Sequence, residues 1–281
     1  MSVLLVTVWL TGCVQEELGA TPSPAGNGIR FTLTVPDVNL PSVSSRTMTG
    51  TGTAKKEDEI ETVDILVFDV SKTPAVFLEW TSATGVTQDL ADNSTVSFSA
   101  VLSPTTASTC IVVVANKELD DIVSGFTKGV TTKVQAMEAM LHIQTGKWLA
   151  DGSTTGGYTR IPMYGEKVIT KIDPSMTPIT GINMKRMLAR IDIHNNSVTS
   201  NFTVEEVYLA NYNTTGYIAP AWNTNGQATE PAPDTPVIPA DSGKMTAEGD
   251  AILYSVNGNT PYDGEIYTFE SLAAEDAGGV G

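Results

Sequence analysis

Few side chains in this sequence are suited to covalent or metal chemistry. The chain holds two cysteines and two histidines, at Cys13, Cys110, His142 and His194. A closed zinc site would need all four, and their spacings resemble no ligand pairing. Cys110 lies in an apolar run and is expected to be a core thiol, and His142 is expected to be a partly exposed helix residue. We therefore expect no metal site.

Signatures of catalysis are also missing. The sequence has no nucleophile elbow and no zinc-protease helix, and Gly243-Lys244 lacks the flanking residues of a phosphate-binding loop. Asp58, Glu59 and Glu61 belong to a charged run that is typical of a solvated face, and nothing selects a pair of acids for glycoside hydrolysis. We expect no catalytic residue, no cofactor and no enzyme activity.

The residues before Cys13 indicate that its thiol is modified. Residues 3–10 form an apolar run that is too short to span a bilayer but suits the core of a signal peptide. The run ends in Leu10-Thr11-Gly12-Cys13, which resembles the lipobox of bacterial lipoproteins. That resemblance implies cleavage between Gly12 and Cys13, and acylation of Cys13 by palmitate-type chains. Residues 1–13 would be the signal peptide and residues 14–28 a flexible tether.

Charge and composition limit the fold classes and the partners that the chain can have. The chain has 281 residues and a net charge of -16, which repels phosphate backbones and argues against nucleic-acid binding. Its 24 Gly, 15 Pro and many β-branched residues favour strands and turns. We expect an all-β fold with one or two short helices, and the length suits two domains.

The first domain is expected to span residues 29–175. Ile29, Phe31, Leu33 and Val35 alternate with polar residues, which predicts a half-buried strand that ends at Pro36. Residues 36–62 form a long polar loop. Residues 63–70 predict a buried strand that pairs with residues 76–80 in a hairpin, residues 96–102 alternate again, and residues 109–115 predict a central strand. Residues 117–125 and 130–143 are the helical candidates, with Val134, Met137 and Leu141 facing a core.

The second domain is expected to span residues 176–281, beyond a boundary near Pro174 and Pro178. In residues 187–194, Met187, Ala189, Ile191 and Ile193 are expected to share one face of a strand. Residues 202–212, 252–256 and 266–269 are further strand candidates. Four or five strands are few for a sandwich, so we expect this domain to be incomplete in the sequence.

The order of these segments resembles the fimbrillin superfamily of Bacteroidales, the major and accessory subunits of surface fimbriae. The likeness rests on the lipobox, the strand at residues 63–70, the segment CIVVVANKELDDIVSG, and the series IPMYGE, MKRMLARIDI and FTVEEVYLANYNTTGYIAP. It implies two tandem transthyretin-like β-sandwich domains. It also implies a structural protein for cell adhesion, located at the outer membrane and in the surface fimbrium.

The resemblance further implies a route of assembly. The precursor would be held in the outer membrane by its lipid until an Arg-specific maturation protease cuts the loop after the first strand. The candidate cut lies between Arg46 and Thr47, because Arg46 is the only basic residue between Pro36 and Ala54. The cut would remove the strand that carries Ile29, Phe31, Leu33 and Val35, and a strand of another subunit would fill the groove.

Other readings of the sequence stay open. The subunit type can be a stalk, an anchor that keeps its lipid, or a tip subunit that binds host proteins or glycans. A surface glycan-binding lipoprotein would share the lipobox and the sandwiches. For that function Trp222, in a loop rich in Pro and Asn, is the best candidate for stacking on a sugar.

Overall fold

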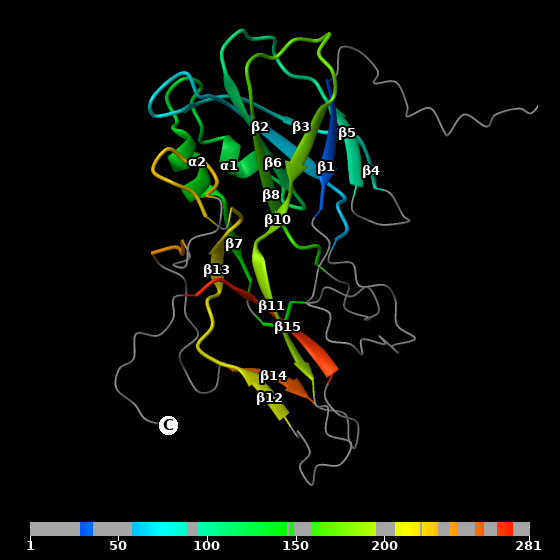
Figure 1. Ribbon diagram of the computed structural model, residues 1–281. Helices are drawn as coiled ribbons and strands as arrows, with labels where there is room; N and C mark the ends of the chain where they lie inside the picture. Colours follow the sequence, from blue (N-terminus) through cyan, green and yellow to red (C-terminus); the bar gives the residue numbers. More distant parts are fainter. Residues whose placement is uncertain are drawn as a thin grey trace, which may run out of the picture.

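The structure is a computed structural model, and it describes part of the chain. The described residues are 29–35, 58–88, 95–144, 146–148, 159–194, 206–219, 221–229, 237–240, 251–255 and 263–271. They form fifteen strands and two short helices (Figure 1). The expected all-β class is confirmed.

The first strand lies inside a four-stranded sheet. This sheet has the order β4-β5-β1-β9, with β4 at Thr84–Gln88, β5 at Thr95–Ala100, β1 at Ile29–Thr34 and β9 at Ile179–Asn183. β1 runs antiparallel to β5 and parallel to β9. The alternation predicted for residues 29–35 and 96–102 is confirmed by the burial of every second side chain.

A five-stranded sheet packs against it, in the order β10-β8-β6-β2-β3. Its strands are β10 (Lys185–Arg186), β8 (Met163–Ile169), β6 (Thr109–Ala115), β2 (Val63–Asp69) and β3 (Val76–Ser82). β2 and β3 form the predicted hairpin, and β6 is central as predicted. Every residue of β2 and β6 is buried, which explains the continuous apolar runs at residues 65–68 and 110–115.

These two strands are buried on both faces because the sheet separates two apolar cores. The first core lies between the sheets and includes Phe31, Leu33, Ile65, Val67, Phe98 and Ile111. The second core lies on the other face and includes Leu66, Phe68, Cys110, Val112, Met137 and Phe269. Helices α1 (Asp120–Val123) and α2 (Lys133–Ala139) lie on the side of the second core, opposite β1 (Figure 1).

The helical prediction for residues 130–143 is partly wrong. Helix α2 begins after Thr132, whose side chain and that of Gln135 form a reciprocal capping box. It ends at Met140, where the backbone leaves the helical region. The next three residues form strand β7 (Leu141–Ile143), which pairs with β13 (Thr215–Tyr217). His142 is therefore a strand residue, and Leu141 does not belong to a helical stripe.

The first sandwich extends beyond the boundary expected near residue 175. Pro174 lies in a turn between β8 and β9, and both strands belong to the sheets of the first sandwich. β10 follows in the other sheet, where Lys185 and Arg186 pair with β8. The expected boundary therefore falls inside the sandwich.

The second half contains two two-stranded sheets in its described part. One joins β11 (Leu188–His194) to β15 (Asp263–Phe269), and the other joins β12 (Glu206–Leu209) to β14 (Ile252–Ser255). A small core formed by Tyr212, Ile252 and Ile266 lies against them. The face that Met187, Ala189 and Ile191 were expected to share is not uniformly buried, since Met187 is buried whereas Ile191 is 44% exposed.

Candidate functional site

The most distinctive site in the described residues is the position that β1 occupies, which we call the β1 seat. On one side of the seat, β5 pairs with β1 in regular register, with Phe31 opposite Phe98 and Leu33 opposite Val96. On the other side, β9 pairs with β1 across a register shift. The backbone N–H of Met184 also donates to the Thr34 carbonyl at 2.9 Å. Both edges of β1 are thus hydrogen-bonded.

The side chains of this strand are deeply embedded in the first core. Ile29, Phe31, Leu33 and Val35 are 3%, 1%, 0% and 1% exposed. The Phe31 ring stacks on Phe98 with centroids 5.0 Å apart and an interplanar angle of 7°. At about 1.5–3 kcal/mol for each buried side chain, the four contribute about 6–12 kcal/mol. That sum is comparable to the whole stability of a small domain.

The seat has no reactive group and can act only by binding. With β1 absent, β5 and β9 would present unpaired backbone N–H and C=O groups beside an apolar trough. Such a surface is complementary to an extended peptide with apolar side chains at alternate positions. The seat therefore suits recognition of a strand.

Several predicted site residues lie outside the described residues. These are Gly12 and Cys13, which would be processed and acylated, and Arg46 and Thr47, which would flank the protease cut. Their roles stay predictions. Of the predicted site residues, the described part of the chain places only Ile29, Phe31, Leu33 and Val35, and all four lie in the β1 seat.

The structure does not support Trp222 as an exposed stacking platform for sugars. Its side chain is half-buried and packs against the second core. Its ring meets Tyr217 edge to face, with centroids 4.6 Å apart at 85°. Neighbours therefore occupy much of the indole surface.

A buried charged cluster was missed by the sequence analysis. Lys133 is fully buried, and its Nζ lies 2.5 Å from Oε2 of Glu166, which also accepts a hydrogen bond from the hydroxyl of Tyr164. Burial raises the pKa of Tyr164, and it raises the pKa of the nearby Cys110 thiol to about 12. Cys110 is thus the inert core thiol that the sequence predicted.

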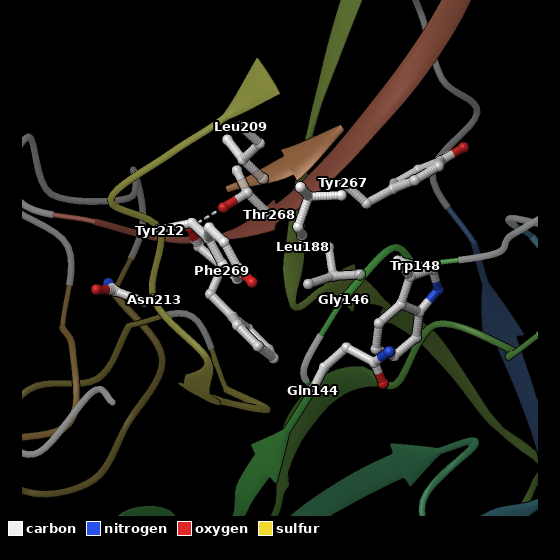
Figure 2. Close-up of a pocket in the computed structure, with 11 residues that line it drawn as sticks. Gln144, Gly146, Trp148, Leu188, Leu209, Tyr212, Asn213, Tyr267, Thr268 and Phe269 are labelled. Atoms are coloured by element: carbon white, nitrogen blue, oxygen red, sulfur yellow. Dashed lines mark hydrogen bonds between the residues drawn. The ribbon is translucent and has the colours of Figure 1, made fainter. Parts of the chain in front are cut away.

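Below the first sandwich, aromatic side chains line a small cavity (Figure 2). Its walls include Trp148, Leu188, Tyr212, Tyr267 and Phe269, and its volume of about 10 Å³ suits one water molecule. His142 lies beside it, with its ring 5.3 Å from Trp148 and 6.3 Å from Phe269. This cavity has no room for a sugar.

A larger depression is polar and open. It has a volume of about 280 Å³ and is lined by Glu61, Thr62, Asn116, Glu118, Thr159 and Arg160. Arg160 forms ion pairs with Glu59 and Glu61 at 3.1 and 2.6 Å. Within the described ranges, no group of three His, Cys, Asp or Glu side chains could hold a metal ion. In the same ranges, no helix has the length and apolar content needed to cross a bilayer.

Comparison with known proteins decides the family. Residues 29–232 match the family model described as major fimbrial subunit protein (FimA). The chain belongs to this family. It is therefore a structural subunit of a fimbrium at the cell surface and not an enzyme, and it assembles with other fimbrial subunits. The match includes the β1 seat and both of its flanking strands.

Solved structures similar to this chain come from species of Parabacteroides and Bacteroides. A fimbrial assembly protein from Parabacteroides distasonis has a TM-score of 0.42 and 11% identity, over 87% of this chain and 77% of that one. A candidate cell adhesion protein from the same species has a TM-score of 0.46 and 16% identity, over 89% and 73%. A candidate polysaccharide-binding protein from Bacteroides thetaiotaomicron has a TM-score of 0.40 and 12% identity, over 87% and 72%. No curated protein matches the chain.

Proposed function

We propose that this fimbrial subunit is a polymerising stalk subunit that matures by losing its first strand. The observation that carries the proposal is the β1 seat, where a strand near the start of the chain lies in the middle of a sheet. The lost strand would be replaced by a strand from another subunit. The assembled fimbrium would then act in adhesion.

Chain connectivity supports release of the strand by a single cut. β1 is the first described element, and the next described residue after Val35 is Asp58. A cut between Arg46 and Thr47 would separate the peptide that carries β1 from the rest of the sandwich. The same peptide would carry the lipid on Cys13 and the tether at residues 14–28. One cleavage would thus release the subunit from the outer membrane and empty the seat.

Without β1, the cut subunit would be unstable and would tend to bind another strand in the empty seat. Losing about 6–12 kcal/mol of apolar burial would remove most of the stability of an ordinary domain. Unpaired backbone groups on β5 and β9 add to that cost. The cut subunit would recover the loss by binding a strand from another subunit, so cleavage drives association.

We also propose boundaries for the domains. Residues 1–13 would be the signal peptide, residues 29–186 the first sandwich, and the second half would begin at Met187. Lys185 and Arg186 pair with β8, whereas Leu188 starts the sheet shared with β15. A subunit that is not cut and keeps its lipid would instead serve as an anchor.

Arg46 gives the first test. We expect an Arg-specific protease to cut wild type between Arg46 and Thr47 and to convert monomer into larger assemblies. Arg46→Lys is the matched control, because it keeps the charge and should be cut by trypsin but not by the Arg-specific protease. Mass spectrometry locates the cut, and light scattering follows the size. Wild type that is cut there and stays a folded monomer without the leader would refute the stalk assignment.

Cys13 gives the second test. Cys13→Ala should abolish incorporation of labelled palmitate and shift the precursor out of the membrane fraction. The control Cys110→Ala should keep both, since Cys110 is buried in the second core. If the Cys13→Ala protein still carries the label, the lipoprotein assignment is wrong.

A further inference from the structure

Residues 221–229 form a compact hairpin, which we call the clasp. Trp222 and Ala228 pair across it, and the N–H of Asn223 donates to the Gln227 carbonyl at 2.8 Å. The Asn223 side-chain oxygen accepts from the N–H groups of Asn225 and Gln227 at 2.9 and 3.1 Å. The turn is therefore held by its own hydrogen bonds.

The clasp comes from the second half of the chain but packs on the first sandwich. Ala221 is 5% exposed, and Trp222 and Ala228 contact the second core. Gly226, at φ 71°, lies directly on the start of α2. A Cβ there would lie 2.9 Å from the nitrogen of Val134 and 3.0 Å from the carbonyl carbon of Lys133. This approach is too close for any residue except glycine.

Glu166 connects the clasp to the sandwich. One carboxylate oxygen binds the buried Lys133 ammonium and the Tyr164 hydroxyl, and the other accepts from the N–H of Ala228 at 2.9 Å. One side chain on β8 thus joins α2 and the clasp. A buried ion pair is tolerated only when its remaining hydrogen-bonding positions are filled, and here Ala228 fills one. Opening the clasp would expose the pair to water.

The clasp and the β1 seat use opposite faces of the five-stranded sheet. The residues of the seat belong to the first core, whereas Tyr164, Trp222 and Ala228 belong to or pack on the second core. None of the residues that define one site belongs to the other. Loss of β1 therefore removes none of the contacts of the clasp.

We propose that the clasp is a conformational lock, which fixes the second half of the chain on the helical layer of the first sandwich and stays closed whether or not β1 is present. The lock is made of the Gly226 contact with α2 and of the bonds of Glu166 to Lys133 and Ala228. It keeps the two halves in one arrangement while the other face of the sandwich changes. The lock does not depend on exchange of β1, so its test is separate from that of Arg46.

The first experiment compares Gly226→Ala with Gly129→Ala in the full chain by hydrogen exchange. Gly129 has nearly the same backbone angle, φ 73°, but nothing lies within 4 Å of an added Cβ. We expect Gly226→Ala to speed exchange in residues 133–139 and 221–229 at least about tenfold, a shift of about 1.4 kcal/mol in opening. Exchange in β1 and β5 should stay unchanged. Equal behaviour of the two variants, or faster exchange throughout the chain in Gly226→Ala alone, would overturn the lock.

A second pair of variants keeps the proposal testable if Gly226→Ala fails to fold. Glu166→Gln removes the charge that faces Lys133. The control Glu138→Gln changes an exposed acid on α2, the helix that also carries Lys133. We expect trypsin to cut after Lys133 in Glu166→Gln only, with the exposed Lys128 as an internal control for protease activity. Protection of Lys133 in the folded Glu166→Gln protein would contradict the role of Glu166 in the lock.

Discussion

At the scale of single residues, His142 makes the fold sensitive to acid. Burial and the nearby Lys117 charge lower its pKa from 6.5 to about 4. Within the described part of the chain, its Nδ1 is buried without a hydrogen-bond partner. The imidazole is therefore neutral at pH 7, packed between Trp148 and Phe269.

This pKa predicts how stability changes with pH. Because the folded-state pKa lies below the unfolded value, the contribution of His142 is complete above about pH 6.5 and is lost as the pH falls toward 4. His142→Phe should flatten the fall in Tm over this range. The pKa values of Asp64 and Glu270 are raised by burial and act in the opposite sense, so the comparison is between variant and wild type. Identical pH profiles would contradict the assignment.

At the scale of elements, β1 and β5 are joined by a stack of two rings, Phe31 on β1 and Phe98 on β5. Phe31→Ala and Phe98→Ala each remove one ring of the same stack, and each should cost the uncut precursor about 3–5 kcal/mol in urea unfolding. Thr34→Ala, at an exposed position of the same strand, is the control and should cost well under 1 kcal/mol. In cleaved, assembled material only Phe98→Ala should still be destabilising, because Phe31 would have left. A persistent effect of Phe31→Ala would mean that β1 stays in the seat.

At the scale of the whole molecule, Gly165 lets the two sheets meet at one corner. A Cβ on Gly165 would lie 2.8 Å from both Ile182 Cγ2 and Met184 Sδ, and 2.9 Å from the Asn183 carbonyl oxygen. Gly165→Ala should therefore lower the free energy of unfolding by about 1–3 kcal/mol. Gly125→Ala, where the nearest atom to a new Cβ is 3.5 Å away, is the control. Equal stability of the two variants would show that the corner is not tightly packed.

Much of the first sandwich was predictable because burial leaves a direct trace in sequence. β1 and β5 alternate since one face of each is buried, and residues 65–68 of β2 and 110–115 of β6 are continuously apolar since both faces are buried. The burial pattern did not predict β7, because a strand of three residues directly after a helix is too short to show an alternation of its own. Its partner β13 is far along the chain, and only this tertiary pairing defines β7.

Candidate site residues were predictable only in part, for a related reason. The four apolar residues of β1 are visible in any local window. The cluster of Lys133, Glu166 and Ala228 is not, because each residue looks like a surface residue in its own segment. Trp222 was misjudged in the same way, since polar neighbours in sequence suggested exposure that Tyr217 and the second core remove.

The pairing of β1 with β9 also orders the events of folding. β1 is near the start of the chain, but one wall of its seat is made of Ile179 and Ile182, which are synthesised much later. Contacts so distant in sequence form slowly, after the local β2–β3 hairpin. The first strand must therefore wait, unpaired on one side, until most of the sandwich exists. The pairing that completes the β1 seat is thus among the last that a newly made chain can form, and proteolysis would undo it after folding is complete.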